Sequence, residues 1–328
     1  MRCWPLLVVF CLVVPSLAAE EELVGPFPSW RDAQRDYGAV GDGRADDTPA
    51  LQRALDDLAR HEKSCVLYLP PGTYRLTAGL KTERKAHTDY QGIGIIGADP
   101  ATVTLRWDGP AGGTMFALDM WYSKISRISF DGAGTAGVGL LYGPAFSTYN
   151  ETSDLWFRDL KQGLTFGGPN TAGQAENAVL RCRFERCELG VQTVNWNSMD
   201  IWVWYSRFVD CGRAIHNQMG NWHAWCNVFE RSKVSDLSIT NLMAFSVVNN
   251  YSRGSRCFLD FSSGHSWGSP TSITGNRVID CTGPFAMLLD NAGPYLVVDN
   301  QFRLSGSNRA VRMTWADQVF CGNRYSAE

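Results

Sequence analysis

Short apolar runs separated by small and polar residues fill most of the chain. Beyond residue 90 no segment has the spacing of an amphipathic helix, whereas a strand-like run followed by Gly, Asn, Asp or Ser recurs throughout. Anchoring each run on one large side chain gives a repeat of about 23 residues, with several short strands per unit, which is typical of a solenoid. The anchors are Phe184, Phe208, Phe229, Tyr251, Val278, Phe302 and Tyr325. The pattern predicts a stack of β-coils.

Asparagine recurs with the same period, two residues before an anchor. The positions are Asn227, Asn249, Asn276, Asn300 and Asn323. In parallel strands about 4.8 Å apart, these side chains would lie above one another, and each amide would hydrogen-bond to the next. Cys187 and Cys211 also lie one repeat apart, where their thiols would either form a disulfide or stack unbridged.

One segment near the N-terminus has a helical pattern. Leu51 and Leu55 belong to an apolar stripe with helical spacing, which predicts a helix over 49–62. Thr48 is suited to the N-cap, and Pro49 to the first helical position. A helix at this place would cover one end of the coil stack.

The first 19 residues predict export. Met1–Ala19 has a basic Arg2, an apolar run at Leu6–Val14 and small residues at its end, as in a secretory signal. This run is shorter than the roughly 20 residues that a membrane span needs, and no later run is longer. We therefore expect a secreted protein, extracellular or periplasmic, with one domain over 20–328.

Charge and cysteine spacing argue against a nucleic-acid partner and against a metal–thiolate site. The net charge is −3 and Lys and Arg are not clustered, so we expect no nucleic-acid partner. Eight cysteines remain after the leader, but none has zinc-site spacing, so no metal–thiolate site is expected.

The N-terminal stretch Asp36–Ala54 (DYGAVGDGRADDTPALQRA), followed by Leu69–Tyr74 (LPPGTY), resembles a known signature. It is similar to the N-terminus of the pectate-lyase-like superfamily, with relatives among polygalacturonase-like hydrolases and exo-β-1,3-glucanases. The resemblance implies an all-β fold, a single-stranded right-handed parallel β-helix of three sheets with an N-terminal capping α-helix. It implies that Asp42, Asp46 and Asp47 are turn and cap residues, and that the asparagine ladder lies between the second and third sheets.

The resemblance also implies a substrate groove along the first sheet. Counting from the anchors places the strands of that sheet at 190–194, 214–218, 236–240, 257–261, 286–290 and 310–314. Alternation then predicts an outward row made up of Gln192, His216, Ser238, Leu259, Leu288 and Arg312.

Polar and aromatic side chains near this groove are the candidate site. Asp290 and Asp260 are the predicted acid–base pair, because glycoside hydrolysis needs two carboxyl groups. His216 and Arg312 would orient or bind a uronate carboxylate, or act as bases in a lyase. The predicted substrate-binding residues are Gln192, Gln218, Trp196, Trp222, His223 and Trp267.

Three functions remain open from the sequence. The first is a glycoside hydrolase acting on a polysaccharide, without a cofactor. The second is a polysaccharide lyase or epimerase acting on a uronate polymer, with Ca²⁺ neutralising the substrate. The third is a non-catalytic binding or structural β-helix, because the aspartate, Gly-His-Gly and Arg-x-Lys pattern of polygalacturonases and the calcium aspartates of pectate lyases are not recognisable.

Overall fold

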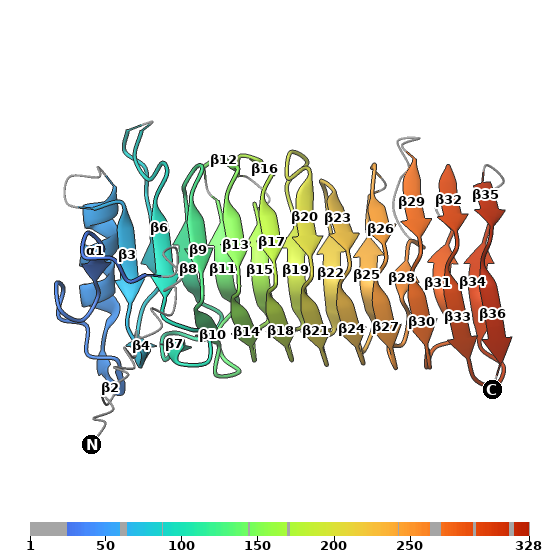
Figure 1. Ribbon diagram of the computed structural model, residues 1–328, viewed down its shortest axis with the longest axis horizontal. Helices are drawn as coiled ribbons and strands as arrows, with labels where there is room; N and C mark the ends of the chain where they lie inside the picture. The colour runs from blue at the N-terminus through green and yellow to red at the C-terminus, as the bar shows by residue number, and fades with distance from the viewer. Residues whose placement is uncertain are drawn as a thin grey trace, which may run out of the picture.

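The chain folds as a right-handed parallel β-helix. The computed structural model describes residues 25–59, 64–86, 88–143, 145–168, 171–241, 243–262, 270–290, 293–314 and 318–327. Within these residues three parallel sheets run along the molecule, and the coils stack from the N-terminal to the C-terminal end (Figure 1). The predicted fold class is confirmed. The predicted leader, Met1–Ala19, lies outside the described residues.

Along the chain the strands enter the sheets in the order A, B, C, and ten of the twelve coils have a strand in all three sheets. Sheet A has twelve strands, at β1 (Arg31–Asp32), β3 (Val66–Leu69), β6 (Gly94–Gly97), β9 (Lys124–Ser126), β13 (Glu151–Ser153), β17 (Ala178–Leu180), β20 (Ile201–Trp204), β23 (Trp222–Trp225), β26 (Ser246–Val248), β29 (Thr271–Thr274), β32 (Tyr295–Val298) and β35 (Gln318–Cys321).

Sheet B also has twelve strands, at β2 (Asp42–Asp46), β4 (Gly72–Leu76), β7 (Val103–Trp107), β10 (Ser129–Asp131), β14 (Trp156–Arg158), β18 (Arg183–Glu185), β21 (Arg207–Val209), β24 (Val228–Glu230), β27 (Tyr251–Arg253), β30 (Arg277–Ile279), β33 (Gln301–Leu304) and β36 (Arg324–Ala327).

Sheet C has ten strands and is the sheet on which the substrate groove was predicted, there counted as the first. They are β5 (Leu80–Lys81), β8 (Thr114–Leu118), β11 (Val138–Tyr142), β15 (Gln162–Phe166), β19 (Leu189–Thr193), β22 (Arg213–Asn217), β25 (Ser235–Ile239), β28 (Leu259–Asp260), β31 (Phe285–Leu289) and β34 (Arg309–Met313). A two-stranded sheet pairs β12 (Ser147–Thr148) with β16 (Gln174–Ala175).

Stacked aromatic rings fill the interior along sheet B. Because the strands are in register, the same inward position repeats on every coil. The rings of Phe130, Phe157, Phe184, Phe208 and Phe229 stack with centroids 5.0, 4.8, 4.7 and 5.2 Å apart, all fully buried. The stacked rings remove a large hydrophobic area from water, and each coil keeps the same geometry as the one before it.

The asparagine ladder runs between sheets A and B, which are the second and third sheets, as expected. Asn227 Nδ2 donates to Asn250 Oδ1 at 3.1 Å, and Asn250 Nδ2 donates to Asn276 Oδ1 at 2.9 Å. The ladder continues at 2.9 and 3.0 Å through Asn300 to Asn323.

One unit of the predicted repeat is displaced by a single residue. Ser252, not Tyr251, pairs with Phe229 and Val278 at the inward position. Asn250 therefore occupies the ladder, whereas Asn249 is exposed with φ 54°. The expectation was wrong because it placed the aromatic side chain inside, and a serine is buried there instead.

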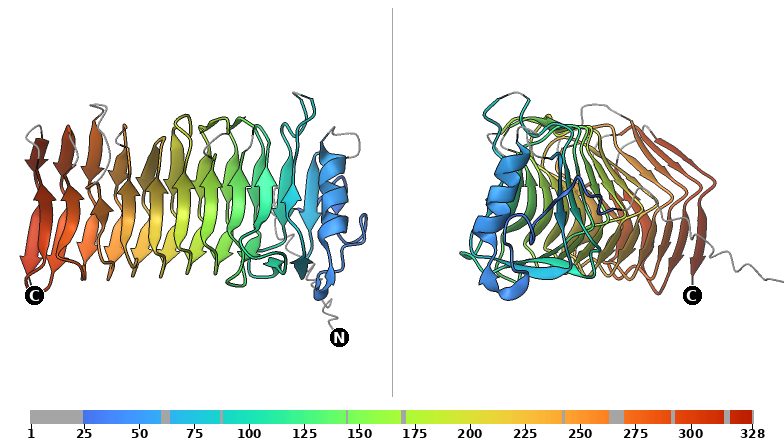
Figure 2. Two further views of the ribbon diagram at one scale, coloured as in Figure 1. Left: turned by 180° about the vertical axis from the view of Figure 1, so that it is seen from behind. Right: turned by 60° about the vertical axis from the view of Figure 1, so that its left-hand side comes forward.

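The helix α1 (Thr48–Leu58) covers the N-terminal end of the stack (Figure 2). It starts one residue earlier than predicted, with Asp47 rather than Thr48 at the N-cap. Asp47 is buried, and its Oδ1 accepts the Val40 backbone N–H at 2.6 Å. Asp46 accepts from Thr48 N and from Thr77 Oγ1. These aspartates therefore hold the turns next to the start of the helix, and the N-cap Asp47 makes no side-chain capping hydrogen bond.

The cysteines of the described chain are all free thiols. Cys187 and Cys211 lie one coil apart, are buried and do not form a disulfide. They stack at the turn between sheets B and C, where Ser232 and Ser255 occupy the next coils. Among the described residues, no helix is long and apolar enough to cross a bilayer.

Candidate functional site

A row of outward side chains follows sheet C from coil to coil. The register pairs, in order, Thr165, Gln192, His216, Ser238, Asp260, Leu288 and Arg312. The structure thus brings His216, Asp260 and Arg312 onto one face, as the sequence predicted for His216 and Arg312. The strands lie one residue earlier than predicted in most coils, for example Leu189–Thr193 rather than 190–194.

The predicted orientation of Leu259 is wrong. Leu259 pairs with Leu237 and Met287 and is fully buried, and Phe258 before it is also buried. Two consecutive inward side chains interrupt the alternation at the short strand β28, so the next residue, Asp260, faces outward. This change places a carboxylate on the candidate surface.

His216 is a neutral imidazole in the middle of this row. Its Nδ1 lies 2.8 Å from Ser238 Oγ on the next coil. Burial, with the charge of Arg213, lowers the pKa of His216 to about 4, although Asp260 opposes the shift. At neutral pH the ring therefore carries no charge and can accept a proton or a hydrogen bond.

Asp290 and Arg312 form a two-point ion pair at the C-terminal end of the row. Arg312 Nε donates to Asp290 Oδ2 at 2.9 Å and to Oδ1 at 3.2 Å, and Nη2 also contacts Oδ2. The guanidinium lies 5.4 Å from the Phe285 ring centroid. The carboxylate is held in one orientation, with its side chain 15% exposed.

Asp260 and Asp290 lie on adjacent coils. Asp260 is level with Leu288, and Asp290 is two residues further along the same chain, where alternation returns the side chain to the outer face. Strand spacing and rise place the two Cα positions roughly 8 Å apart. Asp260 Oδ1 accepts a hydrogen bond of 2.5 Å from Ser262 Oγ.

The predicted substrate-binding residues do not all lie on this face. Gln192 lies in the row but is 1% exposed, and its Oε1 has no hydrogen-bond partner among the described residues. Gln218 and Trp196 are exposed just beyond the strands of sheet C, and Trp196 is 63% exposed. Trp267 lies outside the described residues.

Trp222 and His223 do not belong to this face. Only four residues separate β22 from β23, so both side chains are already in sheet A rather than in a loop. Trp222 points inward, is fully buried and contacts Phe245 at 4.9 Å between ring centroids. His223 points outward on sheet A, around the corner from the predicted groove.

An aromatic cluster on sheet A was missed. Trp202, Trp204 and Trp225 lie together on its outer face. The strict alternation in Ile201–Trp204 (IWVW) and Trp222–Trp225 (WHAW) could have indicated it, because it places indoles on one side of paired strands.

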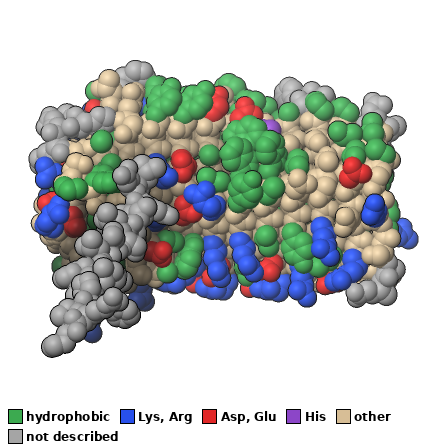
Figure 3. Space-filling model, in the orientation of Figure 1, with side chains coloured by type: hydrophobic (Ala, Val, Ile, Leu, Met, Phe, Trp, Pro, Cys, Tyr) green, Lys and Arg blue, Asp and Glu red, His purple; other side chains and the backbone are tan. Residues whose placement is uncertain are grey.

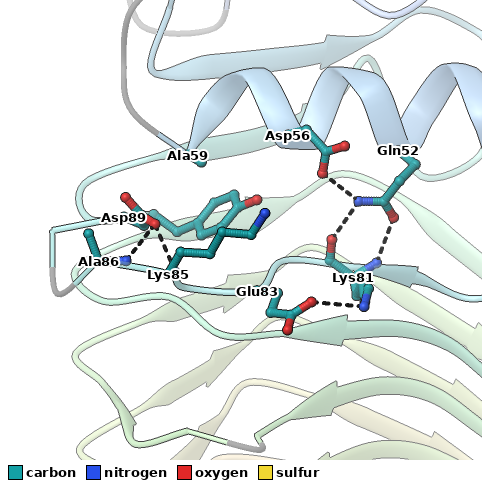
Figure 4. A pocket seen from close by; sticks show the side chains of 9 residues that line it. Gln52, Asp56, Ala59, Lys81, Glu83, Lys85, Ala86 and Asp89 are labelled. Atoms are coloured by element: carbon teal, nitrogen blue, oxygen red, sulfur yellow. Dashed lines mark hydrogen bonds and ion pairs between the residues drawn. The ribbon is translucent and has the colours of Figure 1, made fainter.

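A hollow lies at the N-terminal end of the molecule, between α1 and the segment that starts at Lys81 (Figure 4). It has a volume of about 550 Å³. Its polar groups bind each other: Gln52 bridges Asp56 and the Lys81 backbone, and Lys81 pairs with Glu83. These contacts attach the cap to the first coils, and we do not assign the hollow to the candidate site.

The described side chains do not form a metal centre. Across the residues with described positions, no three His, Cys, Asp or Glu side chains come together in a way that could hold a metal ion. Asp260 and Asp290 would supply only part of the roughly six to eight oxygens that Ca²⁺ takes.

Comparison with known proteins finds a match at the N-terminal signature described above. The family model described as "Rhamnogalacturonase A/epimerase, pectate lyase-like" matches residues 30–115. Together with the parallel β-helix, this match supports the predicted resemblance to the pectate-lyase-like superfamily. The match covers the capping helix and the first coils, and the parallel β-helix of the remaining described chain agrees with it.

Individual relatives match only short segments. Mannuronan C5-epimerase AlgE3 of Azotobacter vinelandii is 41% identical over 72 residues, which is 22% of this chain and 4% of that protein. Alginate lyase 7 of the same organism is 35% identical over 108 residues, 32% of this chain and 11% of that protein. The matched segments are therefore a small part of both relatives.

A solved structure shares the fold over most of the chain. DFA-IIIase from Arthrobacter chlorophenolicus A6 superposes with a TM-score of 0.66, covering 91% of this chain and 84% of that chain at 14% sequence identity. At this identity the likeness shows the fold and nothing more.

Proposed function

We propose that the protein is a polysaccharide-active enzyme, and that it hydrolyses glycosidic bonds on the outer face of sheet C. The observation that carries this proposal is the pair of carboxylates, Asp260 and Asp290, on adjacent coils of that face. Hydrolysis of a glycosidic bond uses two carboxyl groups, about 5–5.5 Å apart in retaining enzymes and about 6.5–9.5 Å apart in inverting ones.

The surroundings of the two carboxylates differ, which favours different roles. The Arg312 guanidinium fixes Asp290, which suits a base or nucleophile with a defined orientation. Asp260 has a serine hydroxyl as its neighbour and is the proposed proton donor. His216, neutral and on the same row, is the proposed hydrogen-bonding group for substrate hydroxyls.

The relatives support a carbohydrate substrate without selecting the reaction. Their names include epimerases, a lyase, a probable glucan endo-1,3-β-glucosidase and a probable rhamnogalacturonase. A lyase or epimerase is the second candidate, because neutral His216 and the cation Arg312 lie on the same row as Asp260. In that reaction they would abstract a proton and neutralise a uronate carboxylate. The third candidate is a binding or structural β-helix.

Incubation with a set of polysaccharides distinguishes these candidates. Pectate, alginate, laminarin and a glycosaminoglycan are each incubated with the protein, with and without a chelator. New reducing ends and the absorbance of unsaturated products are measured in parallel.

We expect new reducing ends without unsaturation, and no effect of the chelator. Unsaturated ends would replace the hydrolase by the lyase, and loss of that activity in chelator would indicate Ca²⁺. Intact polymers in every incubation, with the protein folded by circular dichroism, would contradict cleavage of these substrates. An unchanged uronate composition of the recovered polymers, measured by NMR, would then exclude epimerisation and favour the binding role.

A further inference from the structure

The outer face of sheet A from β20 to β35 is a second surface, and it differs from the candidate site in having no charged side chains among its described outward residues. None of its described outward side chains is Asp, Glu, Lys or Arg. The two rows consist of Trp202, His223, Ser246, Ser272, Leu296 and Val319, and of Trp204, Trp225, Val248, Thr274, Val298 and Cys321. The neighbouring sheet B carries a band of Lys and Arg, whereas a hydrophobic cluster lies over β20 and β23 (Figure 3).

Three indoles form the centre of this surface. The ring centroids of Trp202 and Trp225 are 5.2 Å apart at 80°, and those of Trp204 and Trp225 are 5.9 Å apart at 25°. Trp202 also stacks on the His223 ring at 4.3 Å. Trp225 remains 37% exposed, so the cluster offers an aromatic surface to solvent.

A chain of hydrogen bonds fixes these rings. Trp225 Nε1 donates to Ser246 Oγ at 2.7 Å, and Ser246 Oγ lies 2.8 Å from His223 Nδ1. His223 Nε2 lies 3.1 Å from Asp200 Oδ1. Because an ionised carboxylate only accepts, we assign the ring proton to Nε2, and Ser246 then donates to Nδ1. The aromatic surface is therefore organised in advance of any ligand.

Ser246, His223 and Asp200 are also the residue types of a nucleophilic triad, but the geometry does not favour catalysis. The Ser246 hydroxyl already accepts the indole N–H. Its strand, β26, is paired on both sides by β23 and β29, so its amides bind within the ladder rather than forming an oxyanion hole. The network positions the rings instead.

We propose that this face, the aromatic surface of Trp202, Trp204 and Trp225 with the hydroxyls that follow it, binds an uncharged polysaccharide. Indole rings stack against the apolar faces of pyranose rings. Ser246, Ser272 and Thr274 place hydroxyl groups along the same strands. The site is separate from the carboxylates of sheet C, so the proposal does not depend on the proposed reaction.

Charge and area favour this occupant over others. Among its described residues, the face itself has no cation to contact nucleic acid, a uronate polymer or an anionic membrane, because the nearby band of Lys and Arg side chains lies on sheet B. A Trp side chain presents at most about 250 Å², so three partly exposed indoles present less than about 300 Å². A stable protein interface needs about 800 Å² on each partner, so a second copy of the chain would need a much larger surface.

Affinity electrophoresis tests the proposal on the whole protein. Gels contain laminarin, hydroxyethylcellulose or galactomannan as neutral probes, and alginate or pectate as anionic probes. Binding is measured on Asp290→Asn, so that turnover does not interfere. The test variants are Trp225→Ala and Trp202→Ala, and the matched control is Trp156→Ala, which removes an outward indole from sheet B.

We expect at least one neutral probe to retard the protein, and each test variant to lose affinity about tenfold or more, a loss of roughly 1.4 kcal/mol. Trp156→Ala should show no such loss of affinity. The anionic gels should not retard the protein. Equal mobility in every neutral gel, equal loss in the control, or a dimer in light scattering that Trp225→Ala dissociates would overturn the proposal. Cleavage of soluble substrate by the Trp variants is measured separately, so failure of one site is distinguishable from failure of the other.

Discussion

Arg312 reaches one coil back to Asp290 and donates from Nε at 2.9 and 3.2 Å to the two carboxylate oxygens. The same face of sheet C carries Asp260 and neutral His216. The pair is partly exposed, so we interpret it as a device for orientation more than for stability.

Replacing the guanidinium should therefore affect the reaction more than the fold. We expect Arg312→Ala to lower kcat by about 10²-fold, because Asp290 loses its fixed orientation, while the thermal midpoint stays nearly unchanged. Arg312→Lys should recover only part of the activity, because an ammonium group cannot bind both oxygens in the same fork. Arg181→Ala, which breaks a similar two-point pair with Asp154 away from the site, is the control. Equal losses in both variants would contradict the assignment.

A buried carboxyl group in the core should make stability depend on pH. Asp236 is fully buried, and Ser252 Oγ donates to its Oδ2 at 2.5 Å. Burial raises the pKa of Asp236 to about 7, and the hydroxyls of the surrounding serines offset part of the rise. The folded state therefore binds a proton that the unfolded state releases near pH 4. The contribution of Asp236 to stability falls as pH rises from about 4 to 7, by on the order of 4 kcal/mol.

Asp236→Asn should remove this dependence. The measurement is the free energy of unfolding in denaturant at pH 5 and at pH 8 for both proteins. We expect the free energy of unfolding of the variant to rise relative to that of the wild type at pH 8, because the asparagine side chain cannot ionise. A difference between the two proteins that does not change with pH would show that Asp236 titrates normally.

The asparagine ladder gives a matched pair of variants at neighbouring positions. Asn250→Ala removes the acceptor of Asn227 N and the donor to Asn276 Oδ1, and leaves buried polar groups unpaired. We expect a loss of about 2–4 kcal/mol in the free energy of unfolding. Asn249→Gly, at an exposed position with φ 54°, should change it little, because glycine adopts this backbone conformation easily. The reverse order of effects would restore the register predicted from the sequence.

Thiol reactivity tests whether Cys187 and Cys211 are free thiols, as the structure has them. Cys65 and Cys321 are exposed, whereas Cys187 and Cys211 are buried. Burial also raises the pKa of the nearby buried thiol Cys182 to about 12. In the native protein we expect Cys65 and Cys321 to react first with a thiol reagent, and Cys187 and Cys211 only after unfolding without reductant. If that pair stays unreactive in the unfolded chain, it is a disulfide.

The sequence was sufficient for the architecture because the same side chains return on every coil. Phe184, Phe208 and Phe229 anchor in-register strands, and their spacing alone indicates the solenoid. The predicted register is wrong at Tyr251 and Ser252, because a serine fills an inward position that the pattern assigns to a large residue.

The candidate site was less accessible to sequence reasoning. The alternation that placed Leu259 outward does not reveal that Phe258 and Leu259 both point inward, so it could not show that Asp260 faces outward. Trp222 was expected near the groove because strand ends are not marked in the sequence, whereas the turn before it is only four residues long. Which carboxylates meet across coils depends on these local details.

The central claim is that Asp290 and Asp260 act together on a glycosidic bond, and the most direct test compares initial rates on the polysaccharide that the wild type cleaves. We expect Asp290→Asn and Asp260→Asn each to lower kcat by 10²-fold or more, about 3 kcal/mol in the barrier, and the double variant to lose little beyond the worse single one. Asp154→Asn, which removes a carboxylate from the turn between sheets A and B, should retain the wild-type rate. Wild-type rates in both single variants, with the fold intact, would contradict the account.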